Sequence, residues 1–96
     1  MIAEIYNISG WINSVDELVI KKYFDELLEK SGFTILNYQD HKFNPIGYTG
    51  LWLLSESHFA VHTFPEENKS YIELSSCNYE FYEMFKSECG VFWHCW

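Results

Sequence analysis

Ser57, His62 and Cys77 are three side chains whose types and spacing could together do chemistry. A serine hydroxyl can act as a nucleophile, an imidazole accepts a proton readily at neutral pH, and a protonated thiol can donate one. His62 follows Ser57 by five positions, and Cys77 follows His62 by fifteen. This set predicts a site in which proton transfers accompany attack by the serine.

A serine hydroxyl that lies against the carbonyl carbon of the preceding residue can cut its own chain. If Ser57 lies at a strained turn between two strands, its attack on the Glu56 carbonyl would convert the amide into an ester. β-Elimination would release Glu56 as a new C-terminus and leave a dehydroalanine that hydrolyses to a pyruvoyl group. Thr49 could hydrogen-bond the developing oxyanion, and Gly47 and Gly50 would let the backbone approach closely.

Two stretches of sequence surround these residues. Residues 41–50 read HKFNPIGYTG, and residues 55–66 read SESHFAVHTFPE. Together they resemble the small bacterial-type S-adenosylmethionine decarboxylase proenzyme family, whose members act through a self-generated pyruvoyl group. The resemblance is densest from His41 to Cys77.

The resemblance implies how the chain would be processed. The bond that is cut would be that between Glu56 and Ser57, so residues 1–56 would become a β chain and residues 57–96 an α chain. His62 would be the proton acceptor in this cleavage. One further residue, Thr49, would support it.

The resemblance also implies how the substrate would be handled. The pyruvoyl group from Ser57 would form a Schiff base with the amine of an amino-acid-type substrate and act as an electron sink, without a metal. Cys77 would protonate the product carbon after carbon dioxide leaves. Phe43 would stack on adenine and Glu66 would hydrogen-bond the ribose. Glu4 is a third candidate for substrate binding, because it falls where the family's first strand carries an acidic residue.

Three interpretations of function remain open on the sequence. S-Adenosylmethionine decarboxylation for polyamine and spermidine synthesis is favoured. Thr49 replaces a usual serine, Phe64 a usual tryptophan and Asn78 a usual glycine. The loop after Glu66, residues 67–70, also replaces a more compact turn, so a decarboxylase of arginine or ornithine on the same scaffold is the alternative. A truncated, non-catalytic relative is the third, because both ends are shorter than the family's usual length.

Taken singly, these residues have ordinary structural interpretations. Ser57 alone would be a turn residue, His62 a satisfied strand histidine, and Cys77 a small buried apolar residue. Phe43 would belong to the core, and Glu66 would be a loop charge. Their joint spacing favours the functional interpretation.

Composition restricts the class of protein. The 96 residues are 48% hydrophobic and 20% aromatic, which suits one folded domain over residues 1–96. Fourteen acidic and six basic side chains give a net charge of −8, which repels phosphate backbones, so nucleic acid is not an expected partner. No apolar run approaches the roughly 20 residues of a membrane span, and no secretory signal is apparent. We therefore expect a cytoplasmic protein.

The cysteines and the C-terminal residues add two expectations. Cys77, Cys89 and Cys95 are an odd number without framework spacing, which favours reduced thiols. Cys89, His94 and Cys95 lack a fourth ligand and a recognised spacing, so no metal site is expected. The apolar residues 92–96 and the resemblance favour a homodimer.

Hydrophobic periodicity predicts the secondary structure. Residues 3–8 read as a strand, followed by a turn at Gly10 and Asn13. A capping box from Ser14 to Glu17 begins a helix with an apolar stripe from Leu18 to Leu28, and Gly32 ends it. Further strands are expected at 33–38, 51–54, 59–63 and 71–76, a second helix at 79–88 and an extended segment at 91–96. This order predicts an α+β fold, a two-layer sandwich of a mainly antiparallel sheet with two helices on one face.

Overall fold

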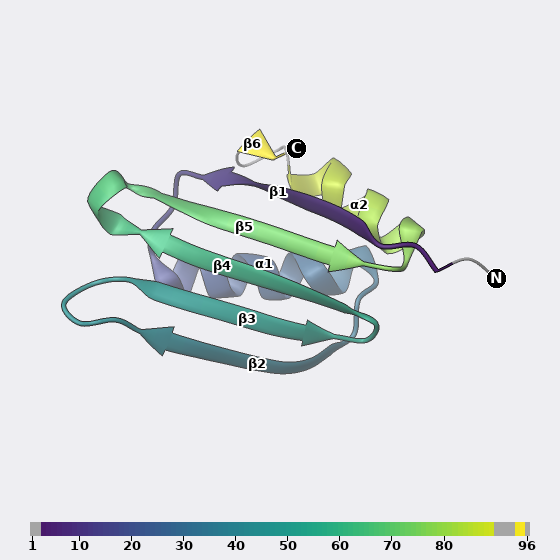
Figure 1. Ribbon diagram of the computed structural model, residues 1–96, viewed down its shortest axis with the longest axis horizontal. Coiled ribbons are helices and arrows are strands. Elements are labelled where there is room, and N and C mark those ends of the chain that lie inside the picture. The colour runs from purple at the N-terminus through teal and green to yellow at the C-terminus, as the bar shows by residue number, and fades with distance from the viewer. Residues whose placement is uncertain (1–2, 90–93, 96) are drawn as a thin grey trace.

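An antiparallel sheet covered on one face by two helices forms the fold (Figure 1). The computed structural model describes residues 3–89 and the backbone of residues 94–95. The elements are β1 (Tyr6–Ile12), α1 (Glu17–Ser31), β2 (Ile35–Lys42), β3 (Tyr48–Leu54), β4 (Ser57–Phe64), the 3₁₀ helix η1 (Pro65–Glu67), β5 (Lys69–Ser76), α2 (Tyr79–Cys89) and β6 (His94–Cys95). The strand order is β2-β3-β4-β5-β1-β6, with every neighbouring pair antiparallel. The α+β prediction is confirmed.

Helix α1 begins two residues later than the capping box predicted. The Asp16 carboxylate, not the Ser14 hydroxyl, accepts from the backbone N–H groups of Leu18 (2.9 Å) and Val19 (3.2 Å). The Ser14 carbonyl instead accepts from the Ser70 hydroxyl on β5 at 2.7 Å. Leu18 is 77% exposed, so it does not belong to the buried stripe.

The C-terminal end of α1 agrees with the prediction. Gly32 has a φ of 110°, and its N–H donates to the Glu29 carbonyl. This left-handed conformation favours glycine because a side chain there is strained. The helix therefore stops where the sequence indicated.

The strands are longer than periodicity indicated, for a reason that lies in their pairing. β1 continues through Gly10, which pairs with Ile72 of β5, so the predicted turn at Gly10 is wrong. β1 also begins only at Tyr6, which leaves Glu4 before it. Ladder hydrogen bonds with a neighbour can hold a residue extended whatever its own preference.

Ring packing joins the helices to the sheet. Phe24 of α1, Trp52 of β3, Phe59 of β4 and Phe85 of α2 are all fully buried. The ring centroids of Phe24 and Phe59 are 4.5 Å apart, and those of Phe59 and Phe85 are 5.4 Å apart. Large aromatic side chains of this kind contribute much of the free energy of a small core.

Among the described residues, no helix covers the opposite face of the sheet. We call this the helix-free face. Along β3 the residues alternate, so Trp52 points into the core while Leu51 and Leu53 remain 46% and 52% exposed. Trp11 of β1 lies on the same face and is 36% exposed. A single chain thus leaves large apolar side chains uncovered here.

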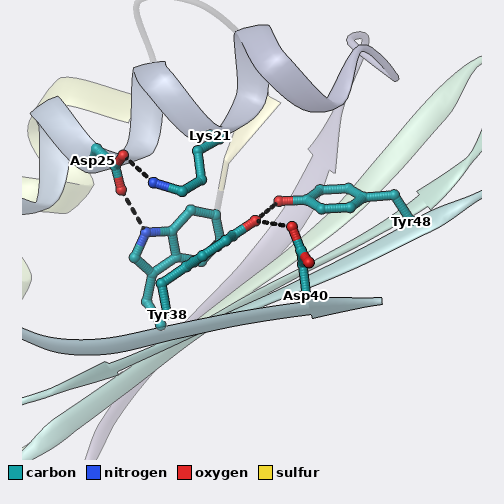
Figure 2. Close-up of polar contacts among 6 residues, drawn as sticks. Lys21, Asp25, Tyr38, Asp40 and Tyr48 are labelled. Atoms are coloured by element: carbon teal, nitrogen blue, oxygen red, sulfur yellow. Dashed lines mark hydrogen bonds and ion pairs between the residues drawn. The ribbon is translucent and has the colours of Figure 1, made fainter. Parts of the chain in front are cut away.

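A polar network fastens α1 to β2 and β3 on the other face (Figure 2). Asp25 pairs with Lys21 and accepts from the Trp52 indole N–H at 2.8 Å. The Tyr38 and Tyr48 hydroxyls are hydrogen-bonded to each other. Burial, and then the hydrogen bond to Tyr48, raise the pKa of Tyr38 above the usual tyrosine value. Burial also raises the pKa of Tyr48, so both phenols are neutral at physiological pH.

The cysteines differ from one another. Cys77 is free and exposed, whereas Cys89 is buried and disulfide-bonded. The prediction that all three cysteines are reduced is therefore wrong for Cys89, and the side chain of Cys95 lies outside the described residues. The cytoplasmic location stays a prediction.

The end of the chain agrees with the sequence prediction where the structure describes it. Residues 94–95 pair with β1, which agrees with the predicted extended segment, and the rest of 90–96 lies outside the described residues. In the described part of the chain, no helix is long and apolar enough to cross a membrane. The same part of the chain contains no cluster of three metal-ligating side chains.

Candidate active site

The peptide between Glu56 and Ser57 lies at the tight turn that joins β3 to β4. Leu54 pairs with Ser57 across this turn, which leaves only Ser55 and Glu56 in the connection. Glu56 has a φ of 63°, a left-handed conformation that costs a non-glycine residue roughly 1–2 kcal/mol. The expected backbone strain is present, and it lies at Glu56, next to the candidate bond.

Two neighbouring residues at the end of β5 contact the reacting atoms of this peptide. Ser57 pairs with Ser76 across β4 and β5, and the Ser57 hydroxyl donates to the Ser76 hydroxyl at 2.8 Å. The Cys77 thiol donates to the Glu56 carbonyl oxygen, with Sγ 3.4 Å from that oxygen. One end of β5 therefore holds the candidate nucleophile and the oxygen on which negative charge would develop.

The Glu56 carboxylate also contacts the Cys77 thiol. Its Oε2 lies 3.4 Å from the Cys77 Sγ. The hydrogen bond from the thiol to Glu56, followed by desolvation and by the carboxylate charge, raises the pKa of Cys77 above the usual thiol value. Since the thiol form is favoured, Cys77 is suited to donate a proton or a hydrogen bond.

Thr49 and His62 form a second group on the strand pair β3–β4. They are directly opposite in register, and the Thr49 Oγ1 lies 3.2 Å from the His62 Nδ1. The rings of His62 and Tyr71 stack with centroids 6.4 Å apart. This arrangement fixes the imidazole on the helix-free face.

Thr49 and His62 line a pocket of about 340 Å³ beside the β2–β3 loop and η1. Phe43, 51% exposed, and Glu66 line this pocket together with Thr49 and His62. The Phe43 N–H donates to the Gly47 carbonyl at 2.8 Å, and Gly47 has a φ of 114°, so this glycine closes the loop that carries Phe43. Two of the three candidate substrate-binding residues, Phe43 and Glu66, are thus together, next to two of the candidate processing residues.

The Ser57 group and the His62 group lie at opposite ends of the sheet. His62 lies five positions after Ser57 along β4, which corresponds to about 16 Å at the usual strand rise. Ser57 also shares the core-facing side of β4 with Phe59 and Val61, whereas His62 lies on the other side. In Figure 1 the β3–β4 turn is at one end and the β2–β3 loop at the other. One chain therefore does not bring His62 or Thr49 to the Ser57 hydroxyl.

The remaining candidates divide in the same way. Glu4 is exposed and accepts from the Tyr6 hydroxyl at 3.0 Å, at the same end of the sheet as Ser57, since Tyr6 pairs with Ser76. Phe64 lines the pocket with Glu66. Asn78 lies apart from that pocket and caps α2, because its Oδ1 accepts from the Phe81 N–H at 3.0 Å.

Sequence reasoning missed two participants of the Ser57 group, the Ser76 hydroxyl and the Glu56 carboxylate. A serine next to Cys77 carries no distinctive signal of its own. Only the register of β4 on β5 places Ser76 opposite Ser57. The register of a strand pair depends on the whole sheet, so it could not be derived from local sequence.

Comparison with known proteins identifies the family. The family model described as S-adenosylmethionine decarboxylase matches residues 1–88. A relative named S-adenosylmethionine decarboxylase proenzyme from Prochlorococcus marinus (strain MIT 9313) is 37% identical over 62 residues, covering 65% of this chain and 50% of the relative. The relative of the same name from Clostridium kluyveri (strain NBRC 12016) is 34% identical over 77 residues, covering 80% of this chain and 60% of the relative.

A solved structure agrees at the level of the fold. The crystal structure of the adenosylmethionine decarboxylase from Aquifex aeolicus VF5 superposes with a TM-score of 0.69 at 20% identity, covering 88% of this chain and 79% of that one. The chain spans about half the length of most of the curated relatives it matches. The family model nevertheless matches nearly all of the described residues, and the chain therefore belongs to the S-adenosylmethionine decarboxylase family.

Proposed function

We propose that this chain is a self-cleaving, pyruvoyl-dependent decarboxylase that converts S-adenosylmethionine to its decarboxylated form and carbon dioxide, for polyamine and spermidine synthesis. The observation that carries the proposal is the Glu56–Ser57 peptide. It combines a left-handed residue, a hydrogen-bonded serine hydroxyl and a thiol on the carbonyl oxygen. The names of the relatives, S-adenosylmethionine decarboxylase proenzyme, support the substrate and processing from a precursor.

In the proposed cleavage the Ser57 oxygen attacks the Glu56 carbonyl carbon. The Oγ–C bond forms and the C–N bond breaks, while His62 accepts the hydroxyl proton and the departing amide nitrogen gains one. Negative charge develops on the carbonyl oxygen, which already accepts from the Cys77 thiol. A preorganised donor at this position lowers the barrier. β-Elimination then removes the Cα proton of residue 57 and breaks its Cβ–Oγ bond, which releases Glu56 as a C-terminal carboxylate and leaves a dehydroalanine. Water adds to the dehydroalanine, and loss of ammonia leaves the pyruvoyl group.

The residues present fit the resulting cofactor. A pyruvoyl group at residue 57 would supply an electron sink for decarboxylation. Departure of Glu56 would remove the carboxylate and the carbonyl that hold Cys77. The thiol would then be free to deliver its proton to the product carbon.

We further propose a homodimer in which the helix-free faces of two chains pack together. Leu51, Leu53 and Trp11 supply exposed apolar area on this face. If the twofold axis lies in the interface plane and runs perpendicular to the strands, each end of one sheet packs against the opposite end of the partner sheet. The pocket end of one chain, with His62 and Thr49, would then lie over the Ser57 end of the other. This arrangement would set two groups that are about 16 Å apart within one chain at the same end of the dimer, with the Ser57 side chain on the core-facing side of the sheet.

The pocket chemistry supports the nucleoside substrate. Phe43 is half-exposed and can stack on adenine, and Glu66 can accept from ribose hydroxyls. The net charge of −8 favours approach of a cationic sulfonium. Release of carbon dioxide from carboxyl-labelled S-adenosylmethionine, arginine and ornithine tests this choice. We expect turnover of S-adenosylmethionine, and turnover of arginine or ornithine alone would contradict it.

Mixed dimers test the shared site. Ser57→Ala lacks the nucleophile and His62→Ala lacks the proton acceptor, so neither chain should cleave alone. When the two are unfolded and refolded together, one site of the mixed dimer regains both groups. The His62→Ala chain should then be cleaved at residue 57. If it stays intact in a mixed dimer demonstrated by differently tagged chains, the shared site is wrong.

A further inference from the structure

We propose that Ser76 is a positioning residue for self-cleavage, because its hydroxyl oxygen accepts the hydrogen bond that orients the Ser57 hydroxyl. The inference rests on the proposed function and adds a residue to it. Ser76 does not contact the carbonyl carbon that is attacked. It would act through the nucleophile.

Burial and hydrogen bonds to Asn78 hold the Ser76 hydroxyl in place. It is 1% exposed, and it lies between β4 and β1, where it pairs in register with both Ser57 and Tyr6. Its Oγ accepts from the Asn78 N–H at 2.9 Å and donates to the Asn78 carbonyl at 3.4 Å. A buried side chain with these partners has one available orientation.

Counting the hydrogen bonds assigns the proton between the two serines. A hydroxyl has one hydrogen to donate and two lone pairs that accept. Ser76 donates to the Asn78 carbonyl and accepts from the Asn78 N–H, so one lone pair remains for Ser57. Ser57 must therefore be the donor of the 2.8 Å bond, which directs its hydrogen toward β5. The Ser57 lone pairs then point away from Ser76 and are free to attack.

Asn78 connects this arrangement to helix α2. Its side chain accepts from the Phe81 N–H, and its carbonyl accepts from the Tyr82 N–H at 3.0 Å. The first turn of α2 thus holds Asn78, Asn78 holds Ser76, and Ser76 holds Ser57. The next residue, Cys77, holds the Glu56 carbonyl oxygen. Two consecutive residues therefore orient the nucleophilic oxygen and the carbonyl that it attacks.

Removal of the acceptor should slow the attack step. In Ser76→Ala the Ser57 hydroxyl loses its partner and samples other rotamers, so we expect cleavage about 10-fold slower than in the wild type, the effect of one lost hydrogen bond. Ser76→Thr retains the hydroxyl and should cleave close to the wild-type rate. Ser76→Cys keeps the size but is a weak acceptor, so it should be slow like Ser76→Ala.

The matched control is Ser70→Ala. Ser70 is also buried on the core-facing side of β5, but its hydroxyl bonds the Ser14 carbonyl at the other end of the strand. We expect Ser70→Ala to cleave at the wild-type rate. Rates are measured by denaturing mass spectrometry on chains made in a cell-free pulse, and thermal unfolding of each variant in a Ser57→Ala background checks the fold.

Hydroxylamine separates slow attack from slow elimination, because it cleaves an ester and leaves an amide intact. If attack is slow, hydroxylamine leaves Ser76→Ala slow. Restoration of the wild-type rate by hydroxylamine would overturn the inference, and so would equal slowing of Ser70→Ala. Wild-type cleavage with an unaffected Ser76→Ala overturns this inference alone. An intact wild-type chain overturns the proposed function and this inference with it. If Ser76→Ala does not fold, Ser76→Cys provides the same comparison.

Discussion

Gly50→Ala should destabilise the protein by about 3 kcal/mol, although it adds only one methyl group. A Cβ at Gly50 would lie 2.5 Å from the Tyr48 hydroxyl oxygen and 3.1 Å from the Trp52 ring. Tyr48 and Trp52 are buried, and the Tyr48 hydroxyl is bonded to Tyr38, so none of these groups can move without loss of a contact (Figure 2). The cost combines overpacking of about 2 kcal/mol with about 1 kcal/mol for the phenol hydrogen bond.

The assay is urea unfolding followed by tryptophan fluorescence, in the Ser57→Ala background so that the chain stays intact. Tyr48→Phe removes the atom nearest to the new methyl group, and alone it should cost about 1 kcal/mol. If the clash is with that hydroxyl, the double variant should lose about 2 kcal/mol instead of an additive value of about 4 kcal/mol. Additive losses would refute the reasoning. It would also be refuted if Gly50→Ala changed the free energy of unfolding by less than about 0.5 kcal/mol, which is the usual range for neutral surface substitutions.

Three further predictions follow from local contacts. In the Ser57→Ala background, Glu56→Gly should raise the free energy of unfolding by about 1 kcal/mol in urea, since glycine adopts a φ of 63° without strain, and a decrease would contradict this. In the same background, Glu56→Gln should lower the pKa of Cys77, so alkylation by iodoacetamide should begin at lower pH than with Glu56, and an unchanged pH profile would count against the contact. Asp16→Ala should cost about 1 kcal/mol in thermal or urea unfolding while Ser14→Ala costs little, because Asp16 caps α1; the reverse order would restore the capping box.

The fold class followed from sequence because periodicity and helix stop signals are local. The stripe that buries Phe24 and Leu28 and the glycine at position 32 each act within one turn of helix. Strand ends did not follow, because pairing with neighbours extends β1 through Gly10. The helix cap was misplaced because Ser14 and Asp16 are both good caps, and the Ser70 hydroxyl, distant in sequence, bonds to Ser14.

The resemblance to the family identified the residues of the candidate site, but it did not predict which of them lie together. Sequence spacing suggested one cluster around Ser57. Strand geometry separates Ser57 and Cys77 from His62 and Phe43, because five extended residues span about 16 Å and alternate residues face opposite sides. The partners of the scissile peptide, Ser76 above all, depend on cross-strand register.

The mass of the C-terminal fragment tests the central claim most directly. Freshly made wild-type protein is incubated, denatured and weighed, with Ser57→Ala as the control. We predict two fragments divided between Glu56 and Ser57, in which the C-terminal fragment weighs less than a serine-terminated one by the mass difference between serine and pyruvoyl and reacts with hydrazine. An intact chain, or a fragment that begins with an unmodified serine, would contradict the account.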